Sequence, residues 1–382
     1  MNVVVCPDKF KGCITAREVA SAVATGIKRY DRSAKVTCLP LADGGDGTLD
    51  VLQHYYQATL HYVDVTDPLG RPIRAPFALS SDNHTAIIEL ASASGIARLS
   101  PSEINPMDTS TEGTGLLIKR ALDAGAREVI IGMGGSATHD GGTGLAFALG
   151  YRFVDKQGNS LQPGGKNLVN ISRIDASGAD ERIAATTFIL AADVSNPLTG
   201  PEGATRVYAE QKGARNEDTY VLESGLENLN MCWKKDLNVD VGEVPGSGAA
   251  GGAGGGAVAF LNARLKKGID WVVRTSKLEG YIQQADLVIT AEGKIDRQTL
   301  HGKVIQGVSS ICKKAEKPLL ALCGTLEADV KTLDDLGVTD ARSLLYQPVS
   351  LAEALKPAYT MAALEQAAAR MYRSFVILQS LR

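Results

Sequence analysis

The sequence predicts an α/β protein built on parallel sheets, and three observations support this prediction. Short apolar runs rich in β-branched residues recur without polar alternation at residues 3–6 and 129–131 and at the centre of 286–290, which is typical of strands buried on both faces of a parallel sheet. Loops of glycine and acidic residues follow several of these runs. Stretches with helical apolar spacing follow the loops, so strands and helices alternate along the chain.

The composition indicates a soluble globular protein of two or three domains, since the chain has 382 residues, 44% of them hydrophobic and 22% charged. The formal net charge of -3 and the aromatic content of 5% argue against nucleic acid or an anionic membrane as a partner. The six cysteines show neither C-x-x-C nor zinc spacing. With no signal-peptide pattern and no apolar run of ~18 residues, we expect a cytoplasmic protein with reduced thiols.

The first elements place charged side chains at the ends of two strands. Residues 2–6 form the first strand, and the loop after it carries Asp8, Lys9 and Lys11. Thr15 and Glu18 then fit a capping box that opens a helix to about Arg29. The next strand, 36–41, runs into a glycine loop that carries Asp43, and a helix starts near Leu49. Ligands of open α/β sheets lie beyond the carboxyl ends of the strands, although each charge could equally belong to a solvated loop.

From Thr59 the pattern changes to that of a second domain with a mixed sheet. Strands are expected at 60–65, 73–79 and 85–90, with a turn at 67–70. Small hydroxyl residues end this segment, among them Ser92 and Ser94, which suit hydrogen bonds to a polar ligand. Residues 109–112 fit a second capping box, opening a helix that ends at Gly125.

The segment 129–150 is the most distinctive stretch of the chain. A strand at 129–131 is followed by a loop of small and polar residues and then by a short helix, 145–149. Backbone N–H groups in such a loop, at the positive end of a helix dipole, can hold a phosphate. The alternative is a tightly packed turn in which glycine only relieves crowding.

The second half of the chain adds further strands with polar ends. A strand at 188–193 ends in Asp193, which could cap a helix, act as a base or bind a metal. The G-x-G-x-x-G match at 246–251 follows Pro245 and no strand, so a dinucleotide site is not expected. Strands at 286–290, 318–323 and 343–346 complete the pattern.

Five parallel strands separated by a long insertion predict a flavodoxin-like doubly wound sheet with a second domain inside it. The predicted boundaries give a discontinuous domain of residues 1–58 plus 283–382, and an inserted α/β domain of residues 59–282. We expect ligands in a cleft that both domains line.

These segments, taken in order, resemble the type I glycerate kinases, the glycerate 2-kinases. The resemblance extends over nearly the whole chain and is carried by Pro-Asp at 7–8, Ala-Asp-Gly-Gly at 42–45, Ala-Ser-Ala-Ser-Gly at 91–95, Gly-Gly-Ser-Ala-Thr at 134–138, Asp-Gly-Gly at 140–142, Asn-Pro-Leu at 196–198, Gln-Lys-Gly-Ala at 211–214, Gly-Ala-Ala-Gly-Gly at 248–252 and Glu-Gly at 292–293. It departs from the family at Ala291, where glycine is frequent, and at 208–210, which bears on substrate choice.

The resemblance implies two unlike α/β domains and transfer of the γ-phosphoryl group of ATP to a hydroxyl of D-glycerate, normally the 2-hydroxyl, with Mg²⁺. We expect no membrane partner, and a homodimer is one expected assembly. Rival functions are phosphorylation at the 3-hydroxyl or of a related hydroxy acid, a non-catalytic binder of small acids, and an oxidoreductase that uses NAD.

Roles follow from what phosphoryl transfer needs, which is positioning, cations and a metal. We expect catalytic roles for Asp193 and Lys11, with Asp193 as the base or a metal ligand beside Glu292 and Asp296. Substrate contacts are expected from Asp8, Lys9, Asp43, Ser92 and Ser94. Phosphate contacts are expected from Gly134, Gly135, Ser136, Thr138, Gly141 and Lys303.

Overall fold

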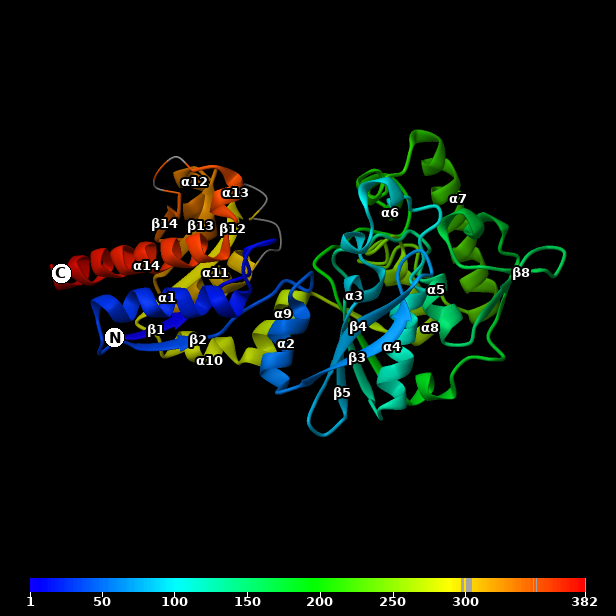
Figure 1. The fold of residues 1–382 in the computed structure, drawn as a ribbon, viewed down its shortest axis with the longest axis horizontal. Helices are drawn as coiled ribbons and strands as arrows, with labels where there is room; N and C mark the ends of the chain where they lie inside the picture. The colour runs from blue at the N-terminus through cyan, green and yellow to red at the C-terminus, as the bar shows by residue number, and fades with distance from the viewer. Residues whose placement is uncertain (297–298, 300–303, 346, 348, 382) are drawn as a thin grey trace. The chain divides into compact units, whose positions relative to one another are not determined.

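The computed structural model describes residues 1–296, 299, 304–345, 347 and 349–381, and these form two compact units. Residues 1–43 and 269–382 make the first unit, and residues 44–268 make the second (Figure 1). The sequence placed the divisions at 58/59 and 282/283. The first division lies earlier because helix α2 (Thr48–Tyr56) belongs to the second unit, where the Leu49 N–H donates to Glu89 at 2.9 Å.

The sheet of the first unit has five parallel strands in the order β2-β1-β12-β13-β14. Numbered by appearance within this sheet, the order is 2-1-3-4-5, the flavodoxin-like order, which confirms the predicted fold class. The strands are β1 (Asn2–Val5), β2 (Lys35–Cys38), β12 (Leu287–Ile295), β13 (Leu319–Leu326) and β14 (Asp340–Ser343).

The last strand of this sheet lies earlier than the sequence predicted. The prediction was 343–346, whereas β14 spans Asp340–Ser343. This strand pairs only with β13 and is half-buried throughout. An edge strand needs no continuous apolar run, so the apolar pattern pointed instead to the leucines that follow it.

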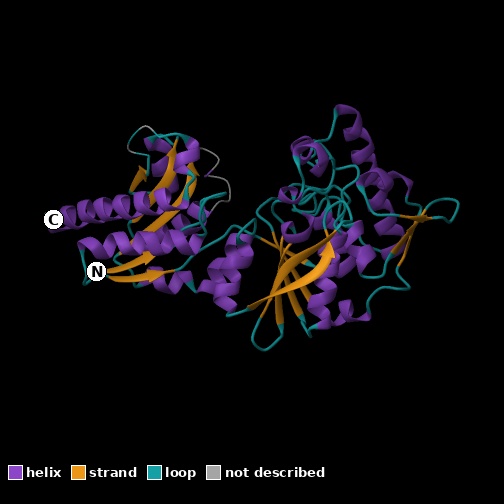
Figure 2. Cartoon of the chain, in the orientation of Figure 1, coloured by secondary structure: helices purple, strands orange, loops and turns teal. Residues whose placement is uncertain are grey.

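Helices cover both faces of this sheet (Figure 2). On one face α1 (Ala16–Tyr30) and α14 (Pro357–Ser380) share one apolar core with Val3, Val5 and Ile289 of the central strands. Both halves of the predicted capping box at Thr15 and Glu18 are present. The other helices of the unit are α9 (Gly268–Ser276), α10 (Leu278–Gln283), α11 (Val304–Ala315), α12 (Val330–Leu336) and α13 (Leu351–Ala354).

The second unit contains a six-stranded mixed sheet in the order β11-β10-β6-β5-β4-β3. Its strands are β3 (Thr59–Thr66), β4 (Pro72–Leu79), β5 (Thr85–Glu89), β6 (Glu128–Gly132), β10 (Thr187–Ala191) and β11 (Arg264–Lys266). The last four run parallel, and β3 and β4 are antiparallel. A small antiparallel sheet joins β7 (Arg152–Val154), β8 (Ser160–Leu161) and β9 (Arg173–Asp175).

The helices of the second unit pack on this sheet around one apolar core. In that core the ring of Phe260 contacts the rings of Tyr151, Phe153 and Trp233. The helices are α2, α3 (Ala91–Ser94), α4 (Glu112–Asp123), α5 (Thr143–Ala148), α6 (Ala204–Tyr208), α7 (Asn216–Cys232) and α8 (Ala253–Leu261), with shorter 3-10 and π turns between them.

The capping box predicted at 109–112 is wrong. Helix α4 begins at Glu112, but its N-cap residue Thr111 makes no side-chain cap hydrogen bond, and the Ser110 hydroxyl accepts the Glu112 N–H at 3.1 Å. The Thr109 hydroxyl donates instead to the Ala137 carbonyl at 2.9 Å, and that of Thr111 donates to the Asp140 carboxylate at 2.8 Å. The threonines therefore hold the glycine loop after β6, a long-range role that local spacing could not reveal.

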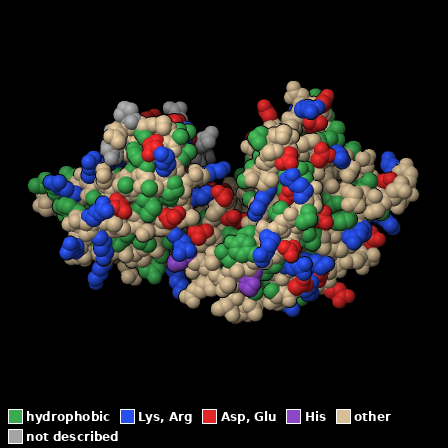
Figure 3. Space-filling model, in the orientation of Figure 1, with side chains coloured by type: hydrophobic (Ala, Val, Ile, Leu, Met, Phe, Trp, Pro, Cys, Tyr) green, Lys and Arg blue, Asp and Glu red, His purple; other side chains and the backbone are tan. Residues whose placement is uncertain are grey.

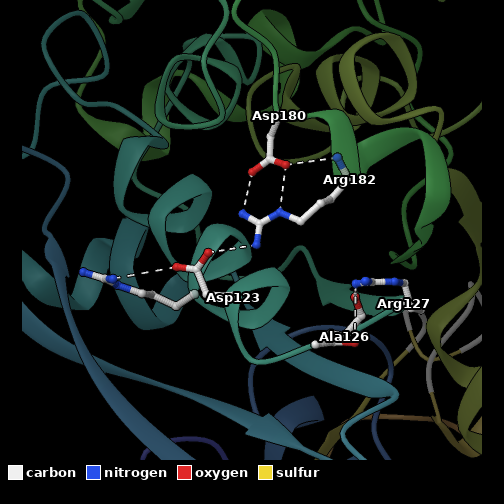
Figure 4. A network of polar contacts seen from close by, with 7 residues as sticks. Asp123, Ala126, Arg127, Asp180 and Arg182 are labelled. Atoms are coloured by element: carbon white, nitrogen blue, oxygen red, sulfur yellow. Dashed lines mark hydrogen bonds and ion pairs between the residues drawn. The ribbon is translucent and has the colours of Figure 1, made fainter.

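An ion-pair network stabilises the six-stranded sheet at the end where β6 and β10 begin (Figure 4). Two nitrogens of the Arg182 guanidinium bind the Asp180 carboxylate at 2.9 and 2.6 Å, and a third donates to Asp123 at 2.9 Å. Asp123 ends α4, so the network fixes that helix to the segment before β10. Its position at the amino ends of the strands leaves their carboxyl ends for chemistry.

No helix in the described part of the chain is long and apolar enough to cross a membrane. Lysine and arginine side chains are interspersed with acidic ones on the visible face of each unit (Figure 3). That mixture agrees with a formal net charge of -3.

Candidate functional site

The first unit contains a pocket of about 460 Å³ at the carboxyl ends of its parallel strands. Residues from the segments after β1, β2 and β14, from the ends of β12 and β13 and from α13 and α14 line it. One wall is charged and the other is apolar. The charged wall consists of Asp8, Lys9, Lys11, Asp43, Glu292 and Lys294.

Backbone hydrogen bonds between neighbouring strands fix Asp8 within the charged wall. The Asp8 N–H donates to the Ala291 carbonyl at 2.8 Å, and the Leu41 N–H donates to the Pro7 carbonyl at 2.8 Å. The segment after β1 is thereby held against the segments that carry Glu292 and Asp43. This is the expected consequence of the parallel order, which brings these carboxyl ends to one edge.

The Asp8 carboxylate of this pocket has a raised pKa. It is 8% exposed, and burial, with smaller contributions from the charges of Asp43 and Glu292, raises its pKa to about 7. The Lys9 charge and the Lys9 N–H, which donates to Oδ1 at 2.7 Å, lower the pKa. A cation placed among these three acids would restore the charged form.

The chemistry of these acids suits Mg²⁺, a hard cation that takes oxygen ligands. Within the described residues, no group of three or more His, Cys, Asp or Glu side chains is arranged as a metal site. Mg²⁺ seldom needs one, because it commonly takes one or two carboxylates together with substrate phosphates and water. The acids of the charged wall therefore fit a metal that arrives with a nucleotide.

One other predicted residue, Asp296, is not among the described side chains that line this pocket. Asp296 lies 3.4 Å from the Lys294 ammonium, which also pairs with Glu327 at 2.8 Å. Lys303 lies outside the described residues, so its predicted phosphate contact stays a prediction.

The second unit has its own cluster of predicted residues at the carboxyl ends of β5, β6 and β10. These strands end in register at Glu89, Gly132 and Ala191. The turns that follow them carry Ser92, the glycine loop and Asp193. The loop after β2 joins them, since a Cβ on Gly134 would lie 2.5 Å from the Gly45 Cα. Only paired glycines allow two backbones to approach this closely.

The serine segment after β5 packs directly on the glycine loop. The Ala137 N–H donates to the Ser94 carbonyl at 3.0 Å, and the Ile96 N–H donates to the Gly135 carbonyl at 2.9 Å. The Ser94 hydroxyl is fully buried and shares a 2.8 Å hydrogen bond with Thr114, and its predicted substrate contact stays a prediction. Ser92 is half-buried at the same edge.

The second half of the glycine loop is a packed turn. The buried Asp140 carboxylate accepts hydrogen bonds from the N–H groups of Gly142 and Gly144, both at 3.1 Å, and so occupies the amino end of α5. The Gly141 N–H donates to the Gly251 carbonyl at 3.1 Å. These N–H groups are hydrogen-bonded within the protein, and Thr138 is fully buried. The phosphate contacts expected from Gly134, Gly135, Ser136, Thr138 and Gly141 stay predictions.

Lys212 is a feature of this cluster that sequence reasoning missed. It is 3% exposed, and its ammonium donates to the Ser136 hydroxyl at 2.8 Å and the Thr138 carbonyl at 2.7 Å. Burial lowers its pKa to about 7, against the opposing effect of the Asp140 charge. The only sequence signal for it was its place in the Gln-Lys-Gly-Ala stretch at 211–214.

The histidine of the loop is buried as a neutral group. His139 is fully buried, and its Nε2 shares a 3.0 Å hydrogen bond with the Thr205 hydroxyl. Burial, with a smaller contribution from the nearby Lys212 charge, lowers its pKa to about 3. A proton is therefore more stable on Lys212 than on His139, and the lysine supplies the positive charge of this cluster.

Asp193 lies two residues beyond the end of β10 and is half-buried. Its Oδ1 accepts the N–H of Gly268, the first residue of α9, at 3.1 Å. One oxygen thus serves as a helix cap, which is one of the alternatives the sequence left open. The hydrogen bond fixes the orientation of the carboxylate, as a base would require.

The comparisons with known proteins agree over nearly the whole chain. The model of the glycerate kinase family matches residues 3–376. A glycerate 2-kinase of Escherichia coli K12 is 41% identical over 359 residues, with 94% of each chain covered. A glycerate kinase of Bacillus subtilis 168 is 41% identical over 358 residues, with the same coverage. The crystal structure of a candidate glycerate kinase 2 from Salmonella typhimurium LT2 superposes with a TM-score of 0.88 at 40% identity, covering 100% of this chain and 99% of that one.

Proposed function

The chain belongs to the glycerate kinase family, and we propose that it transfers the γ-phosphoryl group of ATP to the 2-hydroxyl of D-glycerate. The products are 2-phospho-D-glycerate and ADP. The observation that carries this proposal is the end-to-end match to a glycerate 2-kinase at 41% identity. The charged wall of the first unit and the serine and glycine turns of the second supply groups that such a reaction needs.

In this proposal the charged wall handles the phosphate charge. Lys11 neutralises the transferred phosphoryl group, and Lys9 adds a second cation at the same turn. Glu292, with Asp8 and Asp43 beside it, would hold Mg²⁺. When bound, that ion neutralises phosphate oxygens and orients them for transfer.

The turns of the second unit bind an anionic part of a substrate. Because the Ser136 oxygen accepts a hydrogen bond from Lys212, its own O–H points away and can donate to a carboxylate or phosphate. Gly134 and Gly135 bring backbone close to that ligand, and Ser92 offers a second hydroxyl. Lys212 adds a positive charge that the surrounding protein shields from water.

Asp193 accepts the proton of the attacking hydroxyl of glycerate. Its fixed orientation supports that role, and a carboxylate there could alternatively bind the metal. Phosphorylation at the 3-hydroxyl is the competing outcome, since the enzyme would need only a different orientation of a three-carbon acid.

The direct test is release of ADP from ATP and D-glycerate by the purified protein, followed with a coupled assay. We expect ADP formation to require D-glycerate and to stop when EDTA removes Mg²⁺. Omission of glycerate measures background ATP hydrolysis. Binding of glycerate without ADP formation would contradict the proposal and support a non-catalytic binder of small acids.

We further propose that the enzyme works in the cytoplasm. All six cysteines are free in the structure, which fits a reducing compartment. A homodimer stays a prediction.

A further inference from the structure

We propose that the pocket of the first unit binds the purine nucleoside end of the phosphoryl donor, with the base against its apolar wall. This wall consists of Leu344, Leu345, Leu351, Ala354, Leu355 and Tyr359. The inference rests on the proposed function in one respect, since that function makes a nucleotide one of the two substrates.

The apolar wall distinguishes between the two substrates. Glycerate has three carbons and carries a carboxylate and two hydroxyls, so it has no face that gains from contact with leucine. A purine base has a broad apolar face that does. The pocket volume of about 460 Å³ also lies in the ~300–1,000 Å³ range typical of pockets for larger organic ligands.

Three leucines of this wall are exposed to solvent and line one pocket, which indicates a ligand surface. Leu345 is 38% exposed, Leu351 74% and Leu355 41%, and all three line the same pocket from the segment after β14 and from α13 and its end. Single exposed leucines are ordinary, but several gathered around one concavity are typical of binding sites. A stacked base would cover them.

The pocket also holds a buried polar atom that a nucleoside could satisfy. The hydroxyl oxygen of Tyr359 is buried and has no hydrogen-bond partner among the described residues. Buried polar atoms nearly always have partners, so an exception in a pocket indicates a ligand. A ring nitrogen, an exocyclic amine or a ribose hydroxyl of the nucleoside would form a hydrogen bond with this hydroxyl.

The two walls are arranged in the order that a nucleotide requires. The charged wall lies beyond the carboxyl ends of the neighbouring strands β1 and β12. The strand order reverses between these two strands, and ligands of doubly wound sheets bind at such a point. The apolar wall lies farther along the sheet, beyond β13 and β14. Phosphates and Mg²⁺ at the first wall would therefore place the base at the second.

The test measures binding by calorimetry on the full-length protein, with Mg·ADP and D-glycerate as separate ligands. The pocket variant replaces Leu351 and Leu355 with serine. The control variant replaces Leu378 and Leu381 with serine, at positions that are 63% and 78% exposed and do not line the pocket. We expect the Kd for Mg·ADP to rise at least tenfold in the pocket variant and to stay within twofold in the control. The Kd for D-glycerate should stay within twofold in both.

Tyr359→Phe provides a second, smaller change. Removal of the hydroxyl should raise the Kd for Mg·ADP about threefold or more if that oxygen contacts the nucleoside. Single Leu351→Ser, at the most exposed of these positions, replaces the double variant should the latter lose its native circular dichroism.

Unchanged affinity for Mg·ADP in the pocket variants would overturn the inference, as would weakened binding of D-glycerate in place of ADP. Binding needs no turnover, so the two proposals fail separately. A wild-type protein that binds Mg·ADP in this pocket without phosphorylating glycerate would refute only the proposed function. An active kinase whose Kd for Mg·ADP does not change in the pocket variants would refute only the nucleoside pocket.

Discussion

The fold buries three ionisable side chains, those of Asp8, His139 and Lys212. Burial shifts the pKa of each in the direction that favours its neutral form. The pKa is raised to about 7 for Asp8, and lowered to about 7 for Lys212 and to about 3 for His139. Asp8 could be placed beside a ligand from the sequence because it follows a strand. The burial of Lys212, and of the predicted ligand Ser94, depends on contacts with distant segments and leaves no local pattern.

The raised pKa of Asp8 predicts a pH-dependent cost to stability. The pKa of Asp8 is 3.8 in its ordinary state and about 7 in the folded protein. Between these two pH values the folded state binds more protons than the unfolded state, so the free energy of unfolding falls as pH rises. Asp8→Asn removes the effect. In EDTA, we expect the variant to exceed the wild type in Tm by at least about 2 °C at pH 8, and to lose this advantage near pH 4.

A matched control for that comparison is Asp64→Asn, since the Asp64 side chain is 88% exposed. Its Tm should follow that of the wild type at both pH values. A Tm for Asp8→Asn that lies below the wild-type value at pH 8 would show that the charged carboxylate stabilises the fold, against this account.

The proposed base gives a prediction about catalysis. Asp193→Asn keeps an oxygen that can accept the Gly268 N–H but cannot take a proton. We expect kcat to fall by about 10²-fold or more, with native circular dichroism. A fall in kcat of less than ~10-fold would remove Asp193 as the base.

At the scale of elements, the sequence predicted best where strands are buried on both faces. The strands β1, β12 and β13 were expected close to where they lie, because a central parallel strand needs an apolar run. The half-polar edge strand β14 was predicted a few residues too late in the sequence, and the short strands β7 to β9 were not predicted. The glycine loop was correctly seen as a connection from β6 to α5, but its second half is filled by Asp140 and α8.

The packing of α8 on this loop gives a prediction about two helical glycines. A Cβ on Gly256 would meet the Gly141 carbonyl oxygen well inside van der Waals contact, whereas one on Gly280 in α10 meets nothing within 4 Å. We expect Gly256→Ala to cost about 1–3 kcal/mol of unfolding free energy. Gly280→Ala should instead stabilise by about 0.4–1 kcal/mol.

Urea unfolding of both variants checks this pair. Equal midpoints for the two would mean that α8 does not hold the loop as closely as described. A lower midpoint for Gly280→Ala would contradict the open surroundings of that residue.

At the scale of the whole molecule, two sheets of different kinds each bring polar turns to the carboxyl ends of parallel strands. The order of motifs along the chain was enough to indicate the family, and the family match and the structural relative confirm it. The division between units was harder to predict, because α2 follows a strand of one unit and packs on the sheet of the other. Side-chain roles were hardest, since they depend on burial.

The central claim is that this molecule phosphorylates D-glycerate at the 2-hydroxyl. The most direct measurement is proton-coupled phosphorus NMR of the product formed from ATP and D-glycerate. The account predicts a phosphomonoester resonance split into a doublet by the single proton on C2. A triplet would show transfer to the 3-hydroxyl, and the absence of any phosphoglycerate resonance while ATP and glycerate persist would contradict the account.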